Sequence, residues 1–211
     1  MKDPKQERNR LLGEAVVSAL TSRHFGAQYC ETAADAVEAA CALIPEGASV
    51  TFGGSMTIRD TGLVAALKAG NYQVFDRDEV PPAERGAFVE AHYFSDVYLA
   101  SANALSENGV IYNMDGMGNR VASLIYGPRK VILLVGINKI AKNEESAIAR
   151  VRGTAAPINA QRFDITTPCH KTGRCADCTS PDTICCTMTA MRACRPAGRI
   201  HVIVFGEEYG Y

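Results

Sequence analysis

The sequence lacks a marked excess of charge of either sign. Its 22 lysine and arginine residues and 23 aspartate and glutamate residues give a net charge of -1. Proteins that bind nucleic acid or an anionic membrane surface usually carry a basic excess or a basic patch. We therefore expect neither as the main partner.

Long apolar segments are also missing. The longest strongly apolar run covers residues 131–135, far fewer than the about 20 that a membrane-spanning helix requires. The N-terminal MKDPKQERNR is not followed by the apolar region of a secretory signal peptide. We therefore expect no membrane span and a cytoplasmic protein.

Tryptophan is absent, but the composition is otherwise ordinary, with 47% hydrophobic and 21% charged residues. A chain of 211 residues can bury a continuous core without disulfides. A single domain over residues 1–211 is the simplest division.

The pattern of apolar residues changes along the chain. Helical spacing covers residues 5–22, and Thr32 with Asp35 forms a capping-box-like pair before a second helix. Short apolar strands and helices then alternate, which predicts an α/β fold with a Rossmann-like, mainly parallel sheet flanked by helices. Asn108-Gly109 predicts one β-hairpin. The strands are expected at residues 48–52, 72–75, 97–100, 110–113, 131–135 and 199–205.

Glycines and polar side chains follow several of these strands. In open α/β sheets ligands bind at the carboxyl ends of the strands, and glycines there let the backbone approach a ligand closely. Because Arg120 and Lys139 supply positive charge, we expect a small anion such as a phosphate or a carboxylate. The candidate catalytic residues are Asp115 and Arg120. The candidate ligand-binding residues are Gly53, Gly54, Ser55, Thr57, Gly116, Gly118, Asn119, Asn138 and Lys139.

Purely structural roles compete with this interpretation. Gly53-Gly54 is compatible with a plain strand-to-helix turn, and Ser55 or Thr57 with a helix cap. Asp115-Gly116 is compatible with an ordinary turn. The convergence of several such loops favours a ligand site more than any one of them alone.

Six of the eight cysteines crowd into the segment 164–197, which is expected to be a long irregular loop inserted before the last strand. Cys169, Cys175, Cys178 and Cys185 have the spacing C-x5-C-x2-C-x6-C, and four thiolates satisfy either tetrahedral zinc or a [4Fe–4S] cluster. Cys186 and Cys194 are spare, or one of them replaces one of the four. A redox dithiol, a disulfide or free thiols are the alternatives.

Several segments closely resemble the lactate-utilisation (LUD domain) family. They are GGSMTIRDTGL (53–63), NMDGMGNRVASLIYGPRKVILLVGINKI (113–140), TPCHKTGRCADCTSPDTIC (167–185) and RIHVIVFGEEYGY (199–211). The resemblance implies a fold like that of the sugar-phosphate isomerase and CoA-transferase group (NagB/RpiA-like). It also implies a role beside an iron–sulfur system that oxidises lactate to pyruvate, which favours an iron–sulfur cluster, [4Fe–4S], over zinc. The strand ends would then bind a small hydroxy- or keto-acid.

The resulting hypothesis is a lactate-utilisation protein, a cluster-bearing subunit or accessory of an oxidoreductase acting on a 2-hydroxy acid. It requires a protein partner, and a homodimer is a further expectation. One alternative is an isomerase- or transferase-type enzyme acting on a phosphorylated or acyl substrate, with Asp115 or Glu207 as general base. The other is a non-catalytic binding module in which zinc staples the C-terminal loop.

Overall fold

The structure, a computed structural model, describes residues 3–211 and contains two β-sheets. Residues 1 and 2 of the expected domain 1–211 lie outside the described part. In the larger, six-stranded sheet all neighbouring strands are parallel. Its strands, in spatial order, are β1 (Gly26–Cys30), β10 (Ile200–Phe205), β7 (Lys130–Gly136), β4 (Val97–Ala100), β2 (Ser49–Phe52) and β3 (Gln73–Phe75).

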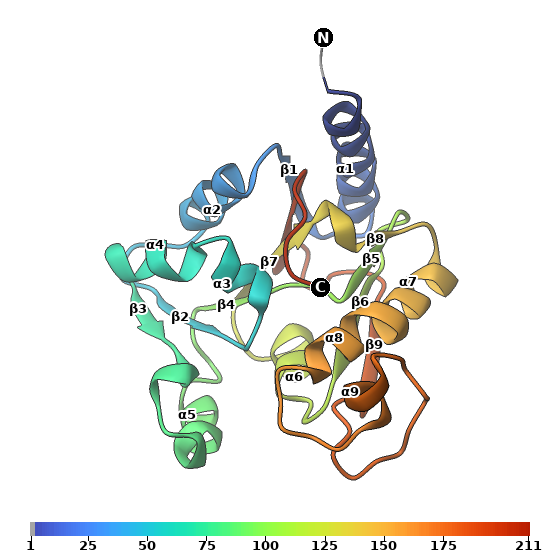
Figure 1. Cartoon of the computed structure of the whole chain (residues 1–211). Coiled ribbons are helices and arrows are strands. Elements are labelled where there is room, and N and C mark those ends of the chain that lie inside the picture. Colours follow the sequence, from blue (N-terminus) through green and yellow to red (C-terminus); the bar gives the residue numbers. More distant parts are fainter. Residues whose placement is uncertain (1–2) are drawn as a thin grey trace.

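Helices cover one face of this sheet (Figure 1). They are α2 (Ala33–Ala42), α3 (Met56–Asp60) and α4 (Leu63–Ala69). Ala36, Ile58 and Leu67 are fully buried there, in one core cluster with Val50 and Ile132 of the sheet. The predicted capping box starts α2, since the Thr32 hydroxyl accepts from the Asp35 N–H and the Asp35 carboxylate accepts from the Thr32 N–H, each over 3.1 Å.

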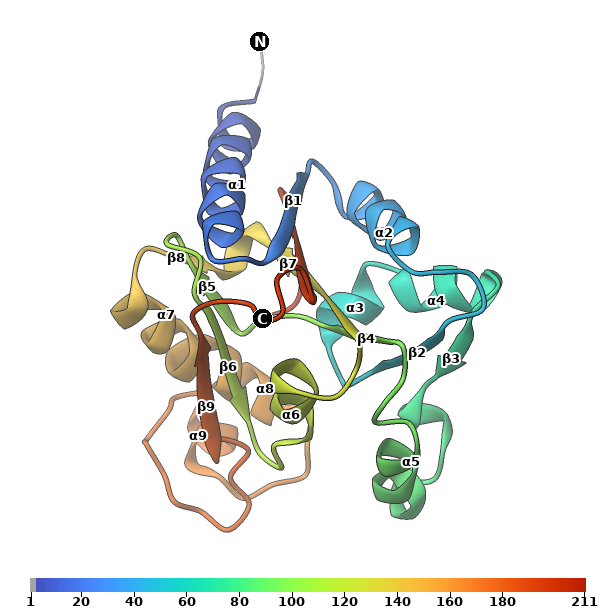
Figure 2. The same cartoon turned by 180° about the vertical axis from the view of Figure 1, so that it is seen from behind.

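The other face of the large sheet contacts α1 (Pro4–Ser22) and the smaller sheet (Figure 2). Val16 and Leu20 of α1 share a second core cluster with Leu133, Val202 and Ile111. The smaller sheet has four strands, in the order β8 (Ile140–Ala141), β5 (Ala104–Ser106), β6 (Ile111–Asp115) and β9 (Thr187–Met191).

The remaining helices surround the smaller sheet and the far end of the large one. They are α5 (Arg85–Ala91), α6 (Asn119–Ile125), α7 (Glu144–Arg150), α8 (Ala156–Ala160) and α9 (Pro168–Thr172), with a π-helical turn at Val151–Ala155 and 3-10 turns at Arg77–Glu79, Pro82–Glu84 and Ile137–Lys139. Ala147 and Val151 cover the outer face of the smaller sheet at Ala104 and Tyr112. The described residues include no helix of the length and apolarity needed to cross a membrane.

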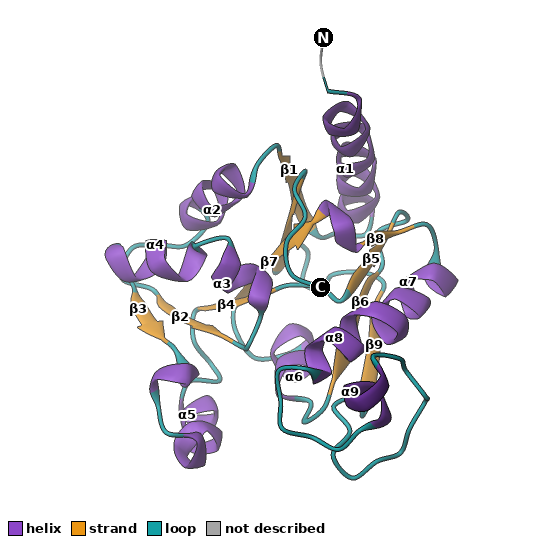
Figure 3. Cartoon of the chain, viewed as in Figure 1, coloured by secondary structure: helices purple, strands orange, loops and turns teal. Residues whose placement is uncertain are grey.

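The predicted fold class is confirmed, with two differences. The hairpin of β5 and β6 turns at Asn108-Gly109, where Gly109 has a φ of +80°, but it belongs to the separate smaller sheet. The segment 164–197 is not irregular throughout, because it contains α9 and β9 (Figure 3). β9 pairs antiparallel with β6, so its backbone hydrogen bonds are satisfied by a strand about 75 residues earlier, which local pattern does not reveal.

Candidate functional site

A cleft of about 490 Å³ lies at the carboxyl ends of β2, β3, β4 and β7, facing the end of β6. This is the edge where parallel sheets bind ligands. The structure brings together nine of the predicted site residues in its lining. They are Gly53, Gly54, Ser55, Thr57, Asp115, Gly116, Asn119, Arg120 and Lys139.

Two predicted ligand-binding residues do not line this cleft. Gly118 precedes α6 in the left-handed region, with a φ of +84°. The Asn138 side chain holds the C-terminal tail, since it donates to the Gly210 carbonyl over 3.1 Å and accepts from the Tyr209 N–H over 3.3 Å. Glu207, the alternative general base, accepts from the Ala33 N–H over 2.6 Å at the start of α2. None of these three residues lines the cleft.

Lys139 is buried at the base of the cleft. Its side chain lies at the end of β7, and the residue is only 2% exposed. Its Nζ lies 2.7 Å from the Thr57 hydroxyl and 2.9 Å from the Ser101 hydroxyl. Burial, together with the positive charges of Arg150 and Arg120, lowers the pKa of Lys139 to about 7, although the carboxylate of Asp60 opposes this. The amine is thus partly neutral near neutral pH.

Positive charge dominates the cleft. Its lining contains one lysine and four arginines, against the carboxylates of Asp78 and Asp115. The arginines are Arg77, Arg85, Arg120 and Arg162. Because α3 has only five residues, its helix dipole is small and these side chains supply most of the attraction for an anion.

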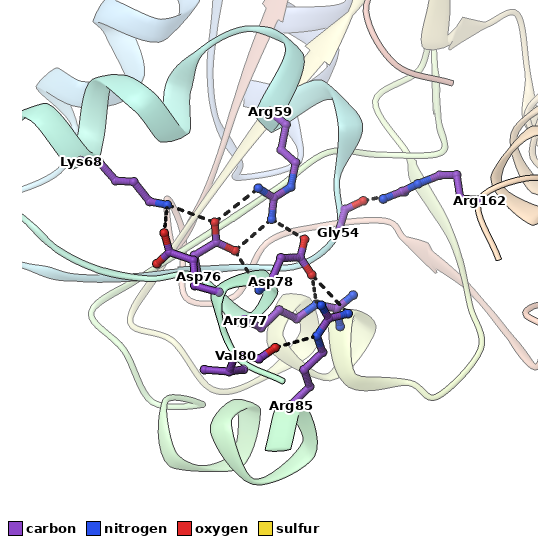
Figure 4. A network of polar contacts seen from close by, with 10 residues as sticks. Gly54, Arg59, Lys68, Asp76, Arg77, Asp78, Val80, Arg85 and Arg162 are labelled. Atoms are coloured by element: carbon purple, nitrogen blue, oxygen red, sulfur yellow. Dashed lines mark hydrogen bonds and ion pairs between the residues drawn. The ribbon is translucent and has the colours of Figure 1, made fainter. Parts of the chain in front are cut away.

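A network of ion pairs positions the arginines of one wall (Figure 4). Asp78 lies 3.6 Å from an Arg85 nitrogen, 3.9 Å from the Arg77 Nε and 2.5 Å from an Arg59 nitrogen. Arg59 also pairs with Asp76 over 2.9 Å. On the opposite side, Arg162 donates to the Gly54 carbonyl over 2.8 Å. The cationic groups are therefore fixed before any ligand arrives.

The two predicted catalytic residues lie together at the end of β6. The Asp115 carboxylate accepts from the Val121 N–H over 2.9 Å, which caps α6, and lies 3.9 Å from the Arg120 Nε. Arg120 also donates to the Met114 carbonyl and to the Asn103 side chain. Both groups are ordered by the protein and still face the cleft.

The sequence-based prediction missed part of the cleft lining, although some of the missed residues could have been predicted. Arg77 and Asp78 closely follow β3, and Ser101 and Asn103 closely follow β4, so the same strand-end rule would have found them. By contrast, Arg85, Asn159, Arg162 and Tyr211 reach the cleft only through the tertiary fold, and no local pattern identifies them.

A second cavity, of about 250 Å³, is lined by five thiols. They are Cys169, Cys175, Cys178, Cys185 and Cys186. Burial raises the pKa of Cys185 to about 11, and the four other thiols of the cavity add to this effect. The other three predicted ligands therefore lie close enough to Cys185 to affect its pKa.

The sixth cysteine of the segment lies elsewhere. Cys194 is buried in the core cluster beside Ile200, whose N–H lies 3.3 Å from its Sγ, and its thiol donates to the Pro196 carbonyl. Cys186 lines the cavity next to Cys185. Of the two spare cysteines, Cys186 is thus the one positioned as an alternative fourth ligand.

The donor set of this cavity fits a sulfur-ligated metal centre. Zinc holds its sulfur ligands about 2.3 Å from one point. Within residues 3–211 no three cysteine, histidine or acidic side chains converge on a single-ion position. The number of thiols is sufficient for a cluster that is held by four cysteines.

The cleft and the thiol cavity share a wall. Met114 and Ile184 line both. The Cys186 N–H donates to the Asp115 carbonyl over 3.0 Å, and the pairing of β9 with β6 continues directly from that bond. A Cβ on Gly116 would lie 3.2 Å from the Cα of Ile184, so the two backbones touch there.

The fold and its two sites define an α/β protein with a cationic strand-end cleft beside a cysteine-lined cavity. Residues 13–205 match the LUD domain family, and the chain belongs to this family. Membership indicates a role related to lactate utilisation, in agreement with the resemblance seen in the sequence.

Among solved structures the chain is similar to a DUF162 family protein from Deinococcus radiodurans, with a TM-score of 0.57 and 12% identity over 93% of this chain and 98% of that one. At this identity the similarity shows the fold alone. An eIF2B delta structure from Chaetomium thermophilum matches at a TM-score of 0.34 and 15% identity, over 67% of this chain and 57% of that one, which is too weak to bear on the fold. No curated protein matches the sequence.

Proposed function

We propose that this protein is a cluster-bearing component of a system that oxidises lactate to pyruvate. The observation that carries the proposal is the wall shared by the cationic cleft and the thiol cavity. A carboxylate ligand in the cleft would lie next to a sulfur-ligated redox centre. Membership of the LUD domain family supports this assignment.

The thiols of Cys169, Cys175, Cys178 and Cys185 would hold an iron–sulfur cluster, with Cys186 as the alternative fourth ligand. A bound cluster supplies electron-transfer chemistry. Thr167, which is 1% exposed, positions the first of these thiols through a 3.3 Å contact between its Oγ1 and the Cys169 Sγ.

In the cleft, the arginines would bind the carboxylate of the acid and fix its orientation. Asp115 is the cleft carboxylate to which we assign the proton of the ligand hydroxyl. Its backbone carbonyl accepts a hydrogen bond from the Cys186 N–H of the thiol cavity. Oxidation of lactate to pyruvate also breaks the C2–H bond, whose hydrogen leaves with two electrons, whereas an iron–sulfur cluster takes up one electron at a time. The proposal therefore includes a protein partner that accepts the C2 hydrogen and both electrons.

The test is anaerobic purification followed by an absorption spectrum and analysis of iron, sulfide and zinc. We expect a brown protein with stoichiometric iron and sulfide whose visible absorption bleaches when lactate and the partner fraction are added. A colourless protein that contains zinc, or that holds no metal after anaerobic reconstitution, would contradict the proposal.

One observation favours a second candidate, an isomerase- or transferase-type enzyme. The cleft of about 490 Å³ falls in the range of about 300–1,000 Å³ typical of drug-sized ligands, which are larger than lactate. Its cations suit a phosphorylated or acyl substrate. Turnover by the isolated protein that survives loss of the cavity cysteines would favour this function.

A further inference from the structure

We propose that Lys139 is a carbonyl-reactive residue whose amine forms an imine with the keto group of a 2-oxo acid bound in the cleft. The 2-oxo acid is taken from the proposed function, in which the product is such an acid. The covalent role of Lys139 goes beyond that function and stands on the geometry around its Nζ.

The amine of Lys139 is held by neutral groups. Its two hydrogen-bond partners are the hydroxyls of Thr57 and Ser101, which are 1% and 4% exposed. Within residues 3–211 no carboxylate forms an ion pair with it. Burial removes the water that stabilises the charged form of an exposed lysine, although the carboxylate of Asp60 acts against this effect.

The surrounding charge acts in the same direction. Arg150 donates to the carbonyls of Asn138 and Asn103, and Arg120 lines the cleft nearby. Both positive charges, added to burial, lower the pKa of Lys139 to about 7. A lysine in such surroundings presents part of its amine in the neutral, nucleophilic form at neutral pH, which is the form that imine formation requires.

The cleft also leaves little room beside the amine. Gly210 of the C-terminal tail passes next to it, and a Cβ there would lie 2.4 Å from the Thr57 Oγ1 and 3.2 Å from the Lys139 Nζ. The ligand must therefore approach from the cleft, where arginines are available for its carboxylate. A 2-oxo acid carries the carboxylate and the electrophilic carbon on adjacent atoms, which suits this arrangement.

The chemistry balances without a further reactant. The Nζ lone pair attacks the keto carbon, the carbonyl π electrons move to oxygen, and a proton passes from nitrogen to that oxygen. The Ser101 hydroxyl, 2.9 Å from Nζ, can relay this proton. Loss of one water then gives the C=N bond, which is protonated to an iminium.

The test is reductive trapping with pyruvate and sodium cyanoborohydride, followed by trypsin and mass spectrometry. Reduction leaves a carboxyethyl group on the lysine and blocks cleavage there, so modification of Lys139 produces the fused peptide 131–142. Modification of the neighbouring Lys142, whose side chain is 79% exposed, produces the peptide 140–150 instead. Lys142 is therefore an internal control for non-specific reaction.

We expect the modified 131–142 peptide with pyruvate and its absence with lactate, which has no keto group. K139R and K139M, checked for folding by circular dichroism, should both lose this label. Labelling of Lys142 at the same level as Lys139, or no label on 131–142 in the wild-type protein, would overturn the proposal.

The two proposals fail separately. If pyruvate raises the melting temperature of the wild-type protein but no adduct forms, the imine is wrong and the ligand of the proposed function stands. If Lys139 is labelled but the anaerobically prepared protein holds no iron or sulfide, the redox function is wrong and the covalent role of Lys139 stands.

Discussion

The cleft and the thiol cavity lie against the same two side chains, Met114 and Ile184, but the chain builds them differently. The cleft collects residues from the ends of β2, β3, β4, β6 and β7, from α8 and its C-terminal loop, and from the C-terminal tail. The cavity is formed mainly by the single segment 167–188, closed by side chains between residues 152 and 157.

The two regions also differ in what orders them. In the cleft, hydrogen bonds from Lys139 to Thr57 and from Arg162 to Gly54 fix the cationic groups. Within the segment 167–188 that forms most of the cavity, the regular structure is limited to α9 and to the start of β9. The sheet therefore preorganises the cleft, whereas the cavity segment depends more on whatever its thiols bind, as metal binding and local folding are coupled.

The largest expected effect separates the two regions completely. The double variant C175S/C178S should lose its metal. Its metal affinity should fall by more than the about 10–100-fold that mutation of an outer-shell partner costs, because two direct ligands are removed. Because the cleft rests on the sheet, its affinity for pyruvate should stay within about twofold of wild type. Iron analysis and isothermal titration calorimetry measure the two quantities.

The matched control for this pair is C41S, because Cys41 is a half-buried free cysteine of α2 and does not line the cavity. It should keep its metal content. Equal loss of iron in C41S, or loss of pyruvate binding in C175S/C178S, would show that the comparison between the two regions is wrong.

The second effect is a pH dependence of stability that arises from Lys139 in the cleft. The pKa of Lys139 falls from 10.5 in the unfolded chain to about 7 in the folded protein, chiefly through burial. Between these values the unfolded chain binds more protons, so Lys139 makes stability rise with pH, by at most about 1.4 kcal/mol per pH unit. Below about pH 7 both states are protonated and the contribution is constant.

K139M removes this contribution. The free energy of unfolding of K139M minus that of wild type should be constant below about pH 7 and fall as pH rises from 7 towards 10. Urea denaturation of the metal-free proteins at several pH values measures it. The exposed K142M variant should follow wild type at every pH, and a K139M difference independent of pH would contradict the burial argument.

The third effect concerns anion binding. R120M removes a cationic donor from the cleft, and charge-assisted hydrogen bonds contribute about 1.5–3 kcal/mol, or roughly ten- to hundredfold in affinity for pyruvate. R120K should recover part of the loss, because it restores the charge but not the bidentate geometry. R152M makes the same charge change in the thiol cavity and should leave pyruvate affinity unchanged.

How much of this fold the sequence predicts depends on whether a strand is recognisable from its own residues or only from its pairing in the folded protein. The buried strands β7 and β10 are apolar over most of their length, so the pattern locates them directly. β1 has the sequence GAQYC and is half-buried throughout, which gives no such pattern. β9 is recognised only through its partner β6, and with it the existence of a second sheet.

The two sites show the same difference between features that local sequence predicts and features that depend on the tertiary structure. Local spacing predicted that Cys169, Cys175, Cys178 and Cys185 lie together, because they belong to one segment of the chain, and all four line one cavity. For the cleft, the residue list was largely predictable from strand ends, but the properties of Lys139 were not. Its burial and the nearby charge of Arg150 depend on the completed tertiary structure.

The smallest expected effect tests how the cavity segment is held. Arg152 forms an ion pair with Asp177, which lies between Cys175 and Cys178. The two side chains are 38% and 83% exposed, so the pair is worth at most about 1 kcal/mol and R152M should speed the loss of iron to a chelator by no more than about fivefold. D177N should match it, and R152M/D177N should exceed neither single variant, because all three remove one interaction. If R152M also weakened pyruvate binding, the shared wall at Met114 and Ile184 would transmit changes between the sites, and the cleft and the thiol cavity would not be independent.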